Sequence, residues 1–246
     1  MTANTNHFTY IPGTYAGRKP GLAQLADASI KEWVKKQQKM GSTKIASAKM
    51  PPAICISRKI GTGAKEIADI LAEKLQYQVA DRELLEYLAK ELEISNDTTA
   101  YFDDRYPGKM SELASMLFSD KSFTMGTNIK NFVGAVYTFA DMGSTIFVGR
   151  GTHLFLPRDR VLSVRVICSD HTRIKRLAKI LDLEENEVNV ILNQVDAEQR
   201  DFFKKAFGKE EASPYEFDIV INCDHITRPA DVAEIIALAF KGKFQI

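Results

Sequence analysis

The stretch Ile54-Cys55-Ile56-Ser57-Arg58-Lys59-Ile60-Gly61-Thr62-Gly63-Ala64-Lys65-Glu66-Ile67-Ala68 decides how the rest of this chain is interpreted. It predicts a short apolar strand, a turn with two glycines, and the start of an amphipathic helix. Glycines let the backbone approach an anion closely, and a helix N-terminus directs free N–H groups and partial positive charge at it. The layout therefore predicts a cradle for phosphate groups. The alternative is an ordinary strand, turn and helix whose glycines only make the turn.

This run departs from the standard phosphate-binding pattern G-x-x-x-x-G-K-[ST]. With Gly63 as the second glycine, Arg58 stands at the first glycine, Ala64 at the lysine and Lys65 at the hydroxyl residue. The usual phosphate lysine and the usual magnesium hydroxyl are therefore displaced or missing. Arg58, Lys59 and Lys65 are the candidates to supply positive charge in their place.

Composition narrows the class of protein. A chain of 246 residues with 45% hydrophobic residues indicates one α/β-sized domain, with or without an appendage. Its 33 basic and 32 acidic side chains nearly cancel, which argues against general binding to nucleic acid or to a membrane surface. No stretch approaches a membrane span, and the N-terminus lacks the apolar core of a signal peptide, so we expect a cytoplasmic protein.

Cysteine and histidine give no sign of a metal centre or a nucleophile. Cys55, Cys168 and Cys223 are odd in number and far apart, and each lies in an apolar run, so we expect buried reduced thiols. The four histidines have no metal-like or nucleophilic neighbours in the sequence, and we interpret all of them as surface or loop residues: His7, His153, His171 and His225.

Residues 1–50 differ from the rest of the chain. The first twenty show no periodicity and read as an extended arm, and Pro20 then opens an amphipathic helical pattern. Its apolar stripe includes Leu22, Trp33 and Val34. We expect the stripe to pack on the main domain, 51–246, or to form a contact with a partner or in a homodimer.

From Pro51 onward, predicted strands and helices alternate. The strands are expected at 53–57, 77–80, 145–149, 163–168 and 218–222, and the helices at 65–75, 82–92, 127–141, 170–181, 184–203 and 228–240. Ser169 and Thr227 stand where N-caps belong, and Pro229 lies in a first turn. Alternation of this kind predicts a mostly parallel sheet with helices on both faces and ligands at the carboxyl ends of the strands. Two segments break the pattern, an insert at about 93–126 and a charged stretch at about 196–215 that we interpret as a lid.

In chain order, these segments resemble the cytidylate kinase-like family of P-loop nucleoside monophosphate kinases, from about residue 53 to about residue 238. The phosphate run resembles the family's I-S-R-x-x-G-S-G-G. Further matches are Asp81-Arg82-Glu83-Leu84, Ile146-Phe147-Val148-Gly149-Arg150-Gly151, Arg173-Ile174-Lys175-Arg176-Leu177, approximately Val195 to Arg200, and Phe217-Asp218-Ile219-Val220-Ile221-Asn222. The segment 148–151 keeps the arginine of the D-G-R-D pattern of true cytidylate kinases but lacks both acids, which argues against cytidine specificity.

The resemblance implies a P-loop NTPase fold: three layers, α/β/α, around a five-stranded mostly parallel sheet, with a helical nucleoside-monophosphate insert and a lid. It implies ATP-dependent transfer of the γ-phosphate to a nucleoside monophosphate or a similar small acceptor, with ATP and Mg²⁺ as cofactors. Because the loop is degenerate, the alternative is a non-catalytic nucleotide-binding sensor or assembly module.

The resemblance also implies roles for particular residues. Residues expected to act on the migrating phosphate are Arg58, Lys65, Arg173, Arg176 and Arg200. Donor phosphates are expected to contact Ser57, Arg58, Lys59, Gly61, Thr62, Gly63, Ala64, Lys65 and Glu66. The acceptor is expected to contact Asp81, Arg82 and Arg150, with Asp81 also linked to magnesium.

Structural alternatives stay open for several of these residues. Asp81 is alternatively an N-cap for the following helix, and Arg150 is alternatively a structural ion-pair partner. Arg173 and Arg176 are alternatively solvated helix charges, and Asp196 with Arg200 alternatively an i,i+4 pair.

Overall fold

The computed structural model describes residue 31, residues 50–91 and residues 126–246. The predicted N-terminal segment, 1–50, apart from Lys31 and Met50, and the predicted insert, apart from Gly126, lie outside these residues. Among the helices in the described part of the chain, none is both long and apolar enough to cross a membrane.

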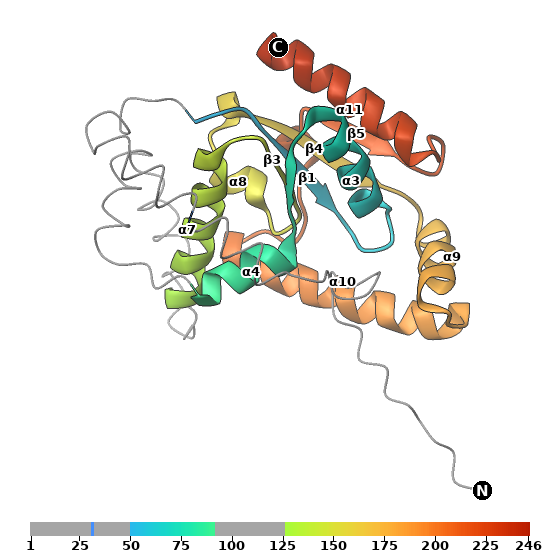
Figure 1. Ribbon diagram of the computed structural model, residues 1–246. Coiled ribbons are helices and arrows are strands. Elements are labelled where there is room, and N and C mark those ends of the chain that lie inside the picture. The colour runs from blue at the N-terminus through green and yellow to red at the C-terminus, as the bar shows by residue number, and fades with distance from the viewer. Residues whose placement is uncertain (1–30, 32–49, 92–125) are drawn as a thin grey trace, which may run out of the picture.

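A five-stranded sheet forms the centre of the molecule (Figure 1). Its strands are β1 (Ala53–Arg58), β2 (Gln78–Ala80), β3 (Thr145–Val148), β4 (Val161–Ile167) and β5 (Ile219–Asn222), in the order β2-β3-β1-β4-β5. Every neighbouring pair is parallel, with Ile54 of β1 opposite Ile146 of β3 and Leu162 of β4. The predicted α/β fold is therefore confirmed.

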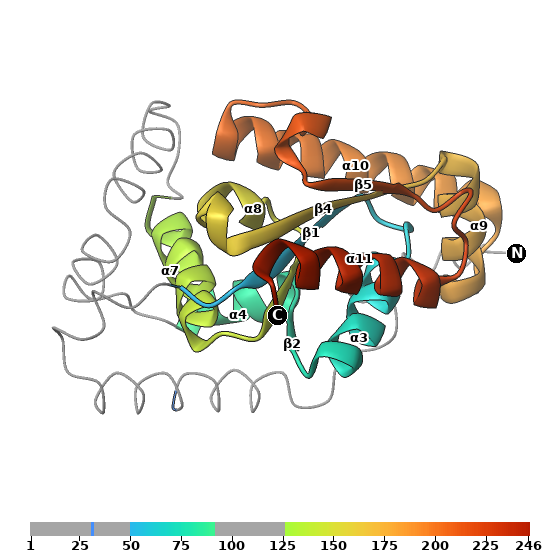
Figure 2. The ribbon, with the colours of Figure 1, turned by 90° about the horizontal axis from the view of Figure 1, so that it is seen from above.

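Helices cover both faces of the sheet, which gives three layers (Figures 1 and 2). On one face α3 (Ala64–Leu75) and α11 (Pro229–Phe244) pack on a cluster that includes Ile54 and Ile56. On the other face α7 (Gly126–Met142) and α8 (Thr152–Phe155) pack on a cluster that includes Ala53 and Cys55. Alternate residues of β1 thus serve opposite faces, and both faces are buried, because β1 is the central strand.

Two of the remaining helices follow the carboxyl ends of strands: α4 (Arg82–Glu91) follows β2, and α9 (Asp170–Leu181) follows β4 and leads into α10 (Glu185–Phe207). Short 3₁₀ turns precede two strands, η1 (Arg158–Arg160) before β4 and η2 (Pro214–Glu216) before β5. A small apolar cluster joins Ile60, which follows β1, to Leu177 of α9 and Val188 and Leu192 of α10. This packing brings α10 beside the loop between β1 and α3.

Several local predictions can be compared with these elements. Ser169 caps α9 as predicted, with its Oγ accepting the N–H of Thr172. The predicted cap at Thr227 is wrong, because Arg228 is the N-cap of α11 and makes no side-chain capping bond. The predicted lid segment is helical as far as Phe207, where α10 ends at Gly208 with φ +64°.

The interpretation of His153 as a surface or loop residue is wrong. His153 lies on α8 with 4% of its surface exposed, and its ring packs 4.7 Å from the ring of Phe217. Its Nε2 lies 3.3 Å from a carboxylate oxygen of Glu216. Burial outweighs this contact and lowers the pKa of His153 to about 4. All three cysteines are free thiols; Cys55 and Cys223 are buried as predicted, whereas Cys168 is only half-buried.

Candidate functional site

The loop between β1 and α3 needs glycine at two positions. Gly61 and Gly63 have φ values of +78° and +81°, which cost a residue with a side chain about 1–2 kcal/mol. A Cβ at Gly61 would lie 3.0 Å from the Arg173 carbonyl oxygen, and one at Gly63 would overlap the Arg176 guanidinium. Gly63 is the N-cap of α3, and no side chain caps this helix end. The first N–H groups of α3 are thus left for an external acceptor.

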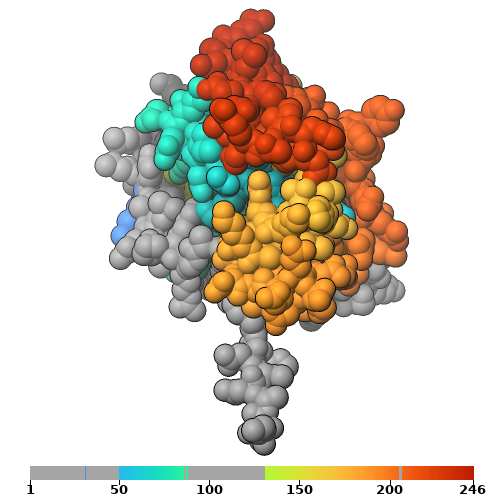
Figure 3. All heavy atoms as spheres, turned by 90° about the vertical axis from the view of Figure 1, so that its right-hand side faces the viewer, coloured from blue at the N-terminus to red at the C-terminus, as the bar shows by residue number. Residues whose placement is uncertain are grey.

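A cavity of about 380 Å³, which we call the loop cavity, lies between this loop, α3 and α9. Its polar lining includes Arg58, Gly61, Thr62, Gly63, Lys65, Glu66 and Arg176. Figure 3 looks onto this side of the molecule, where the loop and the start of α3 come between α9 and α11. Its size lies within the range of small-molecule sites. The structure thus brings most of the predicted donor-phosphate residues together around one space.

The position of the standard lysine is occupied by a core residue. Ala64 is 2% exposed and belongs to the apolar cluster under α3 and α11. The neighbouring Lys65 lies on the cavity wall, with its Nζ 3.1 Å from a carboxylate oxygen of Asp69 one turn further along α3. Positive charge at the loop cavity therefore comes from Arg58, Lys65 and Arg176.

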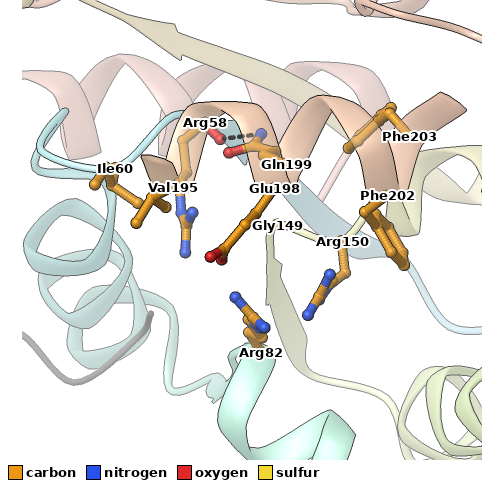
Figure 4. Close-up of a pocket in the computed structure, with 10 residues that line it drawn as sticks. All are labelled: Arg58, Ile60, Arg82, Gly149, Arg150, Val195, Glu198, Gln199, Phe202 and Phe203. Carbon is orange, nitrogen blue, oxygen red and sulfur yellow. Dashed lines mark hydrogen bonds between the residues drawn. The ribbon is translucent and has the colours of Figure 1, made fainter. Parts of the chain in front are cut away.

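A second cavity of about 80 Å³, which we call the arginine cavity, lies on the other side of Arg58 (Figure 4). Arg58 reaches it from the end of β1, Arg82 from the start of α4, and Arg150 from the loop after β3. In Figure 4 the three guanidinium groups and the Glu198 carboxylate point into the same space. Three cations and one carboxylate favour a ligand with an anionic group.

A strained turn aims Arg150 into the arginine cavity. Gly149, Arg150 and Gly151 have φ values of +85°, +56° and +67°, so three successive residues are left-handed. Such a conformation costs about 1–3 kcal/mol for a residue like arginine and persists only where packing enforces it. The Arg150 guanidinium lies 4.3 Å from the ring centroid of Phe202, and a Cβ at Gly151 would lie 2.8 Å from the ring of Phe207. The aromatic side of α10 therefore holds the turn in place.

Arg58 is the residue that the two cavities share. Arg58 is the last residue of β1, the central strand, which lies between β3 and β4. Ligands in crevices at this edge of a parallel sheet are usual for open α/β folds. A guanidinium at this point is placed to contact groups in both cavities at once.

Arg173, which was expected to contact phosphate, is buried and binds other groups of the protein. It is 1% exposed, and its Nε donates to the Ile60 carbonyl oxygen at 2.7 Å. Its terminal nitrogens donate to Asp196 at 2.9 and 2.6 Å and to Asp170 at 2.7 Å. Burial disfavours both charges, but the contact raises the pKa of Arg173 and lowers the pKa of Asp196. Asp196 therefore pairs with Arg173 and, at 3.5 Å, with Lys59.

Four other predicted residues, Ser57, Lys59, Asp81 and Arg200, also lie away from the two cavities. Ser57 Oγ accepts from Arg165 at 2.7 Å, inside the sheet. Arg200 lines a small space of about 30 Å³ together with Lys59, apart from the loop cavity. Asp81 is 8% exposed, and its Oδ1 accepts the N–H of Leu84 at 3.1 Å, so it caps α4.

Metal ligands are sparse in this region. Within residues 50–91 and 126–246, no three His, Cys, Asp or Glu side chains lie close enough together to hold a metal ion. Asp81 as a magnesium ligand stays a prediction.

One face of α10 was missed by the sequence analysis. Val195, Glu198, Gln199, Phe202 and Phe203 all line the arginine cavity. Their spacing of three and four residues marks one face of a helix. The predicted helix at 184–203 contained all five residues, but the stretch from about 196 was interpreted as a lid, and none of the five was assigned to a site.

Comparison with known proteins gives one family and a shared fold. The model of the cytidylate kinase-like family matches residues 53–225. No curated protein matches the chain. An uncharacterized protein from Eubacterium ventriosum has a similar structure, with a TM-score of 0.61 and 16% identity over 78% of this chain and 98% of that chain.

Two further solved structures align with lower scores. A shikimate kinase from Bacteroides thetaiotaomicron gives a TM-score of 0.39 and 15% identity, over 79% of this chain and 99% of that chain. The protein TT1252 from Thermus thermophilus gives 0.42 and 18%, over 78% and 98%. At sequence identities this low, the structural similarity shows a shared fold and nothing about function. The two TM-scores below 0.5 carry no further conclusion.

Proposed function

Because the chain belongs to the cytidylate kinase-like family, we propose that it is an ATP-dependent phosphotransferase. Its acceptor is a nucleoside monophosphate or a similar small molecule that carries an anionic group. The observation that carries this proposal is the position of Arg58, which lines both the loop cavity and the arginine cavity. A phosphoryl group passing from one cavity to the other would meet its guanidinium on the way.

The loop cavity suits the phosphates of the donor nucleotide. Glycine at Gly61 and Gly63 leaves room for an anion to approach the main chain, and the start of α3 directs N–H groups at it. Arg176 lies against Gly63 and would bind the same phosphates with a planar, bidentate group. Lys65 would add a further charge once it leaves Asp69.

The described residues do not fit a magnesium site made by protein ligands alone. In our proposal any Mg²⁺ is coordinated by the nucleotide phosphates and water, as is common for this ion.

The transfer itself needs positioning and positive charge more than covalent help from the protein. Arg82 and Arg150 bind the acceptor's anionic group and aim its nucleophilic oxygen at the γ-phosphorus. The new phosphorus–oxygen bond forms as the bond to the bridging oxygen breaks, and that oxygen leaves with its electron pair as part of ADP. Arg58 neutralises the charge on the migrating group.

The test is an assay of ADP formation by the purified full chain with Mg-ATP and a panel of nucleoside monophosphates. We expect turnover with at least one acceptor, and a loss of about 10²-fold or more in Arg58→Gln. Arg228→Lys is the control, because this arginine is exposed and pairs only with Asp231 among the ion pairs found. Folded protein without turnover on a broad panel would overturn the proposal.

The second candidate is nucleotide binding without transfer. The alanine at position 64, where the standard loop has lysine, and the pairing of Lys65 with Asp69 favour it, because both reduce the positive charge that the standard loop would offer. It predicts that calorimetry detects ADP and ATP binding while the assay above stays at background. Turnover that Arg58→Gln abolishes would exclude this candidate.

A further inference from the structure

Helix α10 holds three consecutive residues of the phosphate loop. The Gln199 side-chain amide donates to the Arg58 carbonyl oxygen at 3.1 Å. Asp196 lies 3.5 Å from the Lys59 ammonium. Asp196 also binds Arg173, whose Nε donates to the Ile60 carbonyl oxygen at 2.7 Å. The last residue of β1 and the next residue are therefore tied to α10 directly, and Ile60 is tied to it through Arg173 of α9.

These contacts control the direction of main-chain N–H groups. In a trans peptide the carbonyl and the N–H of the next residue point in opposite directions. The Ile60 carbonyl is held toward Arg173, so the N–H of Gly61 is turned the opposite way. In the described part of the chain, the N–H groups of Gly61 and Gly63 make no hydrogen bond to another main-chain group. They are available to an anion in the loop cavity.

We propose that Arg173, Asp196 and Gln199 are positioning residues that hold the phosphate loop in its anion-binding conformation. The proposal rests on the proposed function, because the bound anion is taken to be the donor's phosphate. It gives Arg173 a task different from direct phosphate contact. Arg176, three residues along α9, contacts the ligand, whereas Arg173 shapes the loop that receives it.

The chemistry of the cluster suits this task. Arg173 is 1% and Asp196 8% exposed, and the guanidinium uses its fork on both Asp196 oxygens while its Nε reaches the loop. A lysine keeps the charge but lacks the planar set of donors that makes these bonds together. The guanidinium geometry, and not the charge alone, therefore fixes the Ile60 carbonyl.

Two variants separate positioning from simple stability. Arg173→Lys keeps the charge and removes the Nε bond to Ile60. Gln199→Met keeps the approximate size and removes the donor to Arg58 on a half-buried residue, so this variant is the milder one for folding. The matched controls are Arg228→Lys and Gln245→Met, both at exposed positions of α11 and its ends.

Two measurements on the full chain decide the outcome. Calorimetry gives the ADP dissociation constant well below the unfolding temperature, and backbone ¹⁵N relaxation of the ligand-free protein gives order parameters for Gly61 and Gly63. We expect ADP to bind about tenfold more weakly in Arg173→Lys and Gln199→Met than in the controls. We expect the order parameters to fall from about 0.85 to below about 0.6.

The results distinguish failure of this inference from failure of the proposed function. Wild-type protein that binds no ADP would refute the donor role of the loop, while the order parameters would still decide whether these residues position it. If both variants match their controls in order parameters and in ADP affinity, the inference is overturned. Variants that unfold at lower temperature but keep both quantities would likewise overturn it, because the contacts would then only stabilise the fold.

Discussion

Gly63→Ala probes the anion cradle with one added methyl group. Gly63 has φ +81°, and a Cβ there would overlap the Arg176 guanidinium. The backbone conformation costs alanine about 1–2 kcal/mol of the free energy of unfolding. For a chain of this length that lowers the unfolding temperature by about 2–8 °C. The overlap adds little to this cost, because the guanidinium lies at the end of a flexible side chain that can turn away.

Gly63→Ala should weaken ligand binding more than it destabilises the fold. The methyl group displaces Arg176 from the loop and occupies space next to the open N–H groups of α3. A hydrogen bond to a charged group contributes about 1.5–3 kcal/mol. We therefore expect the ADP dissociation constant of Gly63→Ala to rise by about ten- to a hundredfold, measured by calorimetry at a temperature where the variant is folded.

Gly208→Ala is the matched control. Gly208 has φ +64° at the end of α10, and a Cβ there would meet nothing within 4 Å. It carries a similar backbone cost without a clash, so its unfolding temperature should fall by a similar amount while its ADP affinity stays at the wild-type value. Equal ADP affinities in the two variants would refute the reasoning, because the loop cavity would then not be the phosphate site.

Three further results are expected. Arg150→Gln should lower kcat/KM for the acceptor by about 10²-fold or more and leave ADP affinity unchanged, since Arg150 lines the arginine cavity and not the loop cavity; an equal loss of ADP affinity would contradict this. Phe202→Leu, which removes the ring 4.3 Å from the Arg150 guanidinium, should lower the same kcat/KM by about two- to thirtyfold in steady-state assays, and no change would mean that the ring does not hold Arg150. Burial lowers the pKa of His153 from the usual 6.5 to about 4, so the unfolded chain binds the proton first as the pH falls. The stability contributed by neutral His153 should therefore be complete above pH 6.5, and the free energy of unfolding should fall by up to about 3 kcal/mol as the pH is lowered toward 4. Urea titrations of His153→Gln should show a smaller fall over this range. A pH profile identical to that of the wild type would refute the assignment.

The order of elements followed from local patterns. Alternating apolar strands and amphipathic helices predicted a parallel sheet with helices on both faces, and the structure has that fold. Gly61 and Gly63 marked the turn because few other residues adopt its backbone angles. These features depend on residues close together in the chain, so a single sequence contains them.

The interior environment of single residues could not be predicted in the same way. His153 is polar and lies in a short helix, yet Phe217 and Glu216 from a segment more than sixty residues later enclose it. Ala64 stands where a phosphate lysine is usual. It is buried in the apolar cluster that α3 shares with the distant helix α11, so its burial depends on tertiary structure.

Arg173 and Arg176 show most clearly what the local sequence could not predict. Both lie at the start of α9 in one motif, and by sequence they were equal candidates for phosphate contact. The sequence determined that two guanidinium groups would stand near the loop between β1 and α3. Tertiary structure decided that Asp196 of α10 draws Arg173 into the interior while Arg176 lines the loop cavity. The physical reason is that a buried guanidinium needs a carboxylate to offset its lost hydration, and that carboxylate comes from a distant part of the chain.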